Sequence, residues 1–89
     1  MLARAKTALR IRTDAFDSEI EDLIESAKAD LELIGIIADE TDPLVRTAIL
    51  THVRINFGQP EDPERLKRAY DEQKAQLQIS SKHKAVNDG

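Results

Sequence analysis

The 89-residue chain has room for one small hydrophobic core, and its 40% hydrophobic and 34% charged residues are typical of a soluble helical domain. It contains no cysteine, which excludes disulfide bonds and thiolate metal sites, and no run of about 18 apolar residues that could span a bilayer. Its net charge of −4 argues against the strongly basic surface of a nucleic-acid-binding protein.

The charge is unevenly distributed along the chain. Residues 1–12 carry four basic side chains and no acidic one, whereas residues 14–42 carry eleven acidic side chains against Lys28 alone. An acidic middle segment is compatible with plain solvated surface. It is equally compatible with attraction between different faces of neighbouring copies. Such a head-to-tail contact closes into a ring when the rotation from one copy to the next permits it. The basic N-terminal segment lacks the apolar stretch of a signal peptide, so the sequence predicts a cytosolic chain.

Two amphipathic helices are predicted in the first half of the chain. Residues 2–10 form a short one without a strong cap, and residues 15–35 form the longest periodic pattern. Gly35 is expected to end the longer helix. Its apolar face is formed by Phe16, Ile20, Leu23, Ile24, Ala27, Leu31 and Ile34.

A third helix, residues 43–57, is expected to be central. Asp42 can cap its first turn, Pro43 suits the first helical position, and Gly58 offers a left-handed stop. Apolar side chains cover most of its circumference, which favours a helix surrounded by others.

The Asp62–Pro63 pair repeats the same start signal and predicts a fourth helix over residues 63–78. The residues after Ile79 are polar and aperiodic, which is typical of a flexible tail. The sequence therefore predicts an all-α bundle of three main helices plus a short N-terminal one. We expect residues 1–79 to form a single domain, followed by a flexible tail over residues 80–89.

No metal or cofactor site is predicted. Asp39, Glu40 and Asp42 share one loop, but the loop lacks the glycine and terminal glutamate of an EF-hand. With only His52 and His83, the chain cannot supply the several imidazoles of a zinc site. We expect His52 to be partly buried and hydrogen-bonded.

Catalysis is not predicted either. None of the serines, at positions 18, 26, 80 and 81, lies near a histidine or lysine in an arrangement typical of an activated nucleophile. The carboxylates of residues 15–34 point outward by periodicity, whereas acid–base chemistry needs two that face each other across a cleft. The sequence therefore predicts a protein that is not an enzyme.

Helices 43–57 and 63–77, with the turn between them, could be mistaken for a helix-turn-helix. The second helix would present Arg65, Lys67, Arg68 and Lys74, but acidic neighbours balance these charges. This balance of charge argues against DNA binding, and a small DNA-binding regulator is kept only as the less favoured alternative.

Three segments in order resemble a known family. They are ALRI, FDSEIEDLIESAKADLELIGI and DPLVRTAILTHVRINFG, and the closing stretch RLKRAYDEQKAQLQIS adds to the resemblance. Over roughly residues 7–79 this order resembles the small helical head-to-tail connector proteins of tailed bacteriophages and prophages, also called adaptor or head-completion proteins.

The resemblance implies a structural protein of virion assembly. Copies would form a ring at the head–tail junction that docks on the portal protein after DNA packaging. The ring would extend the DNA channel, pass DNA without sequence-specific binding, and present a surface to the next connector or tail protein. The chain would be made in the host cytoplasm and would have no membrane contact. A generic helical interaction adaptor is the other alternative.

We expect the contact between copies to combine charge with apolar surface. Exposed ion pairs contribute only about 0–1 kcal/mol each, so apolar burial is also needed. The acidic side is predicted to be Glu19, Asp22, Glu25 and Asp30, the basic side Arg46, Arg54 and Arg10, and the apolar part Ile36, Ile37 and Leu50. The three apolar residues are chosen because the intrachain stripes do not use them.

Overall fold

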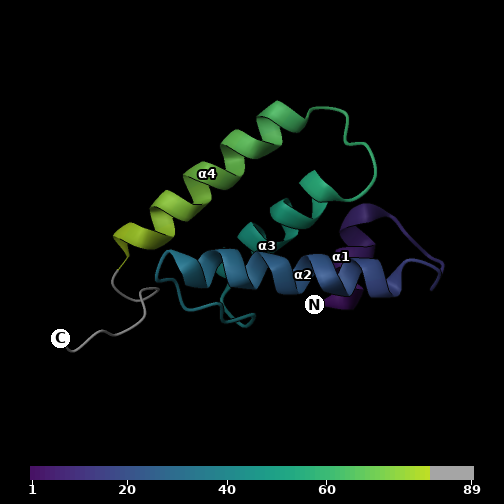
Figure 1. Ribbon diagram of the computed structural model, residues 1–89, viewed down its shortest axis with the longest axis horizontal. Helices are drawn as coiled ribbons and strands as arrows, with labels where there is room; N and C mark the ends of the chain where they lie inside the picture. Colours follow the sequence, from purple (N-terminus) through teal and green to yellow (C-terminus); the bar gives the residue numbers. More distant parts are fainter. Residues whose placement is uncertain (81–89) are drawn as a thin grey trace.

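The computed structural model describes residues 1–80, and its secondary structure consists of four helices. They are α1 (Leu2–Leu9), α2 (Asp17–Leu33), α3 (Pro43–Asn56) and α4 (Pro63–Ile79). Figure 1 shows α2 lying across the front of α1, with α3 behind it and α4 running back toward the C-terminal end of α2. The predicted all-α fold, with three main helices and a short N-terminal one, is confirmed. Residues 81–89 of the predicted tail lie outside the described residues.

Helix α3 is central, as its apolar circumference predicts, because it packs against each of the other three helices. The core takes side chains from every helix, and its largest fully buried members are Ile20, Leu31, Ile36, Ile49, Leu77, Val45 and Val53. Helix α4 contributes little apolar surface and buries only Tyr70 and Leu77. It is held to the bundle mainly along α3.

Both aspartate–proline pairs start helices as predicted. The Asp42 carboxylate accepts a hydrogen bond from the Leu44 backbone N–H at 2.9 Å, and Asp62 accepts one from the Arg65 N–H at 3.1 Å. Each following proline occupies a position whose N–H would lack a helical partner. Gly58, with φ 64°, follows the end of α3 in the left-handed conformation predicted for it.

Helix α2 ends in a Schellman turn centred on Gly35, whose φ is 80°. The Gly35 N–H donates to the Glu32 carbonyl at 3.0 Å, and the Ile36 N–H donates to the Leu31 carbonyl at 3.0 Å. This geometry folds the residue after the glycine back against the helix, so Ile36 joins Leu31 in the core. The helix itself is shorter than the predicted 15–35 because Phe16 is its N-cap and Ile34 its C-cap.

The same kind of turn ends α1, but a non-glycine residue occupies the left-handed position. Arg10 has φ 59° and ψ 40°, and the Ile11 N–H donates to the Lys6 carbonyl at 2.9 Å. Lys6 then bridges to Asp14 and Asp17, each at 2.8 Å, which ties α1 to the start of α2. Arg10 is thereby fixed at a sharp corner of the surface.

Candidate interaction surfaces

The outer side of α2 is an acidic surface. The three predicted acidic contact residues Glu19, Asp22 and Glu25 are all exposed on it. Lys28, the only basic residue of the helix, is partly buried and pairs with Glu40 and, at 3.6 Å, with Glu25. The fold therefore leaves the outer side of α2 with a strongly negative charge.

The fourth predicted acidic residue, Asp30, turns instead toward α4. Its carboxylate accepts a hydrogen bond from the Tyr70 hydroxyl at 2.5 Å and one from Lys74 Nζ at 3.2 Å. Lys74 also lies 4.6 Å from the centre of the Tyr70 ring, a cation–π distance. The hydrogen bond from Tyr70 lowers the pKa of Asp30, and burial raises the pKa of Tyr70. Asp30 thus fastens α4 to α2 within one copy.

Asp30 gives a pH dependence with a defined sign. Because its pKa is lowered from 3.8 in the folded state, the unfolded chain binds its proton first as the pH falls. The free energy of unfolding should therefore fall as the pH drops through 3.8. Asp30→Asn should cost on the order of 1 kcal/mol at neutral pH and flatten this acid decline, measured by urea unfolding between pH 7 and pH 2.5. Glu72→Gln, an exposed carboxylate of α4, is the control and should leave the decline intact.

His52 is partly buried beside this cluster, as the sequence predicts. Its ring lies 5.3 Å from the Tyr70 ring, and its Nε2 is 3.3 Å from Ser26 Oγ. Burial lowers the pKa of His52. Nothing in the sequence indicated the contact between Ser26 and His52, because α2 and α3 bring together positions 26 residues apart. The pair lies at an exposed serine and links the two helices.

The predicted basic residues fall into different surroundings. Arg54 is exposed near the end of α3, and Arg10 is exposed at the corner after α1. Arg46 is half-buried and donates to the backbone carbonyls of Glu40 and Thr41 at 3.3 and 3.2 Å. Arg46 therefore braces the loop before α3, while Arg54 and Arg10 are presented to solvent.

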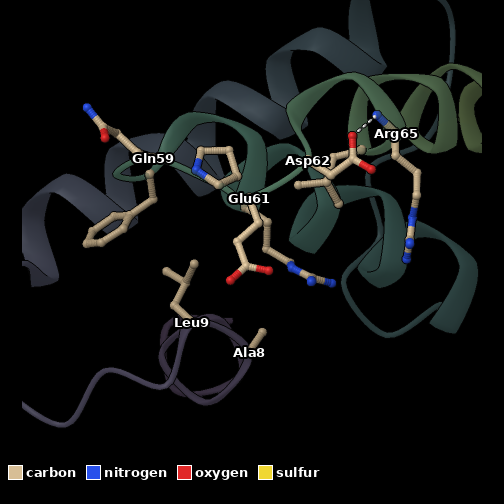
Figure 2. A pocket seen from close by; sticks show the side chains of 10 residues that line it. Ala8, Leu9, Gln59, Glu61, Asp62 and Arg65 are labelled. Atoms are coloured by element: carbon tan, nitrogen blue, oxygen red, sulfur yellow. Dashed lines mark hydrogen bonds between the residues drawn. The ribbon is translucent and has the colours of Figure 1, made fainter.

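Arg54 lines a cleft of about 360 Å³ where α1, α3 and the α3–α4 loop meet (Figure 2). Leu9 and Phe57 supply apolar walls, and Arg65 lines the side formed by α4. Figure 2 shows the Glu61 side chain reaching from the loop toward Ala8 and Leu9 of α1. The cleft thus combines apolar walls with charges of both signs.

The apolar part of the predicted contact needs one correction. Ile36 is only 1% exposed, so the expectation that the fold leaves it unused is wrong. The Schellman turn at Gly35 is the physical reason, since it folds Ile36 onto Leu31. Ile37 is 44% exposed, and Leu50 is half-buried at the edge of the core, so both reach the surface.

The sequence prediction missed the most exposed aliphatic residues. Leu33 is 84% exposed and Ile79 81% exposed, at the last positions of α2 and α4. Leu44, at the start of α3, is 54% exposed. The helical phase could have identified Leu33, because it lies well away from the stripe formed by Leu31 and its buried partners.

The acidic loop before α3 is used for local structure. Asp39 accepts hydrogen bonds from the Thr41 backbone N–H at 2.9 Å and from its hydroxyl at 2.7 Å, and Asp42 caps α3. Glu40 pairs with Lys28 and with the Met1 amino group at 3.4 Å.

Within residues 1–80, no group of three His, Asp or Glu side chains is placed to hold a metal ion. In the same part of the chain, no helix is long and apolar enough to cross a membrane.

A protein-family model described as phage connector protein matches residues 1–84. The chain belongs to the phage connector protein family. The resemblance seen in the sequence is thereby confirmed. No curated protein and no solved structure matches the chain.

Membership of the phage connector family indicates a role in phage assembly. The family is structural rather than enzymatic, and its members act in phage assembly at the head–tail junction. The partners of this connector are therefore other phage head and tail proteins.

Proposed function

We propose that copies of this connector assemble into a closed ring at the head–tail junction. The ring docks on the portal protein, extends the DNA channel, and offers a surface to the next connector or tail protein. DNA passes through it without sequence-specific contacts. The observation that carries the proposal is the family match over residues 1–84, joined to the separation of an acidic α2 surface from exposed arginines on α1 and α3.

Native mass spectrometry over a concentration series, at low and moderate salt, tests the ring directly. One dominant large stoichiometry supports it. A chain that stays monomeric moves the test to the portal protein, which could template the ring. A stable dimer that shifts duplex DNA in a gel would contradict the ring and favour a DNA-binding regulator.

Reversing the charge of Arg54 should weaken assembly without unfolding the subunit. Arg54→Glu places a negative charge on the surface proposed to meet acidic α2, and its exposure means that the core is untouched. We expect the oligomer to need a higher protein concentration at low salt, while the circular dichroism spectrum stays helical.

Arg68→Glu is the matched control, because it makes the same charge change at an exposed position on α4. It should assemble like the parent chain. If Arg54→Glu also assembles like the parent at low salt, Arg54 has no place in the contact.

A further inference from the structure

Helix α3 has an outward side that the bundle does not cover. Thr47, Leu50 and Arg54 recur at helical spacing on it, turned away from the buried face that packs against α2. A shallow, open hollow separates Leu50 of this stripe from α1, where Ala3, Arg4, Thr7 and Ala8 line it. A second hollow of about 200 Å³ separates it from α4, where Gln73, Gln76 and Leu77 line it. We call the outward stripe of α3 and its two flanking hollows the α3 trough.

The chemistry of the trough suits another helix. Along α1 its side chains are small apart from Arg4, and Leu44 and Leu50 add apolar surface. Gln73 Oε1, on the α4 side, is buried and has no hydrogen-bond partner within residues 1–80. Buried acceptors without a donor are rare in folded proteins. The surface that the trough offers to a partner is mainly apolar.

The outer side of α2 forms a matching ridge. Asp22, Ala29 and Leu33 follow one another at spacings of seven and four residues, which places them on one stripe. All three are exposed, and Leu33 is the most exposed large aliphatic side chain of the described residues. We call this stripe the α2 ridge. Its centre is small and its end apolar, so it has the shape of a helix-packing surface.

The charges beside the two surfaces are opposite. Glu19, Glu25 and Glu32 are exposed beside the α2 ridge, whereas Arg4 and Arg54 are exposed at the α3 trough. Helices α2 and α3 pack on each other through their buried faces, so the ridge and the trough point away from each other. One copy cannot bring them together. Two copies can, in a head-to-tail contact that leaves a free ridge and a free trough for further copies.

From this complementarity we infer that the α2 ridge of one copy seats in the α3 trough of the next copy. The inference rests on the proposed assembly of copies and names the surfaces that would build it. Ala29 meets the α3 stripe, Leu33 fills one of the flanking hollows, and the acidic flank of the ridge lies against Arg4 and Arg54.

Cysteine cross-linking tests the seat, because the natural chain contains no cysteine. The double variant Ala29→Cys/Thr47→Cys places one thiol on the ridge and one in the trough, both at exposed positions. Under mild oxidation it should form a ladder of dimers, trimers and larger species on a denaturing gel. A mixture of the two single variants should give one cross-linked dimer, since each contact then has a single thiol on each side.

The matched control is Ala29→Cys/Ala75→Cys, which moves the second thiol to the exposed side of α4 and should give no ladder. A dimer from Ala29→Cys alone would show a symmetric ridge-to-ridge contact and overturn the inference. A closed oligomer in native mass spectrometry without a ladder would also overturn it, while leaving the ring intact. If the chain stays monomeric at every concentration, the same cross-linking is done with the portal protein present, where a bound chain without a ladder would overturn the inference and leave the proposed function intact.

Discussion

Ile36→Ala is expected to cost about 2–5 kcal/mol of the free energy of unfolding, the range measured for truncating a fully buried aliphatic side chain to alanine. Ile36 is 1% exposed and packs in the core after the turn at Gly35. In a domain of this size, each kcal/mol lowers the melting temperature by roughly 4–8 °C. Urea unfolding followed by circular dichroism, together with a thermal scan, measures both quantities.

The adjacent isoleucine supplies the control. Ile37 is 44% exposed, so Ile37→Ala should change the free energy of unfolding by only about 0.5 kcal/mol. The two substitutions remove the same atoms from neighbouring positions and differ only in burial. Equal losses of stability would show that Ile36 is not a core residue in solution.

Local signals account for what the sequence predicted correctly. Asp42–Pro43 and Asp62–Pro63 determine where α3 and α4 begin through contacts within a few residues, and these contacts can be recognised in the sequence itself. The apolar circumference of α3 likewise predicted its central place. The burial of Ile36 escaped prediction because it depends on the direction that the chain takes after Gly35, which helical periodicity does not describe.

Long-range pairs account for most of what was missed at the candidate site. Asp30 shares the acidic composition of α2, yet Tyr70, 40 residues away, draws its carboxylate into the subunit. Ser26 and His52 meet in the same way, across two helices. A single helix pattern gives the phase of a side chain but not the neighbour that it meets. Composition alone therefore grouped Asp30 with Glu19 and Glu25, although only the latter two face solvent.

Helix α2 thus divides its polar residues between two tasks. Asp30 and Ser26 reach toward α4 and α3, whereas Glu19, Asp22 and Glu25 keep the outer side acidic. Because the inner attachments already hold the helix in place, its outer stripe is presented in a fixed geometry. A rigid surface loses less conformational entropy when it binds, which favours assembly from folded subunits.

Ala29→Arg is expected to abolish most assembly of the connector while leaving the subunit folded. Ala29 lies at the centre of the α2 ridge, where the inferred contact has room only for a small side chain. An arginine at this position is too large for the contact, and it also lies against Arg54 of the next copy. Like charges brought together at an interface cost several kcal/mol. Since about 1.4 kcal/mol corresponds to a factor of ten, the concentration needed for assembly should rise by roughly a hundredfold or more.

Ala75→Arg is the matched control for this variant, since it makes the same substitution at an exposed alanine on α4. Arginine is a good helix former, so both variants should keep the helical circular dichroism and the stability of the parent. Native mass spectrometry should then show oligomers for Ala75→Arg and single subunits for Ala29→Arg. If both variants assemble equally, the ridge is free in the ring, and the acidic side of α2 must then serve another phage protein or simply face solvent.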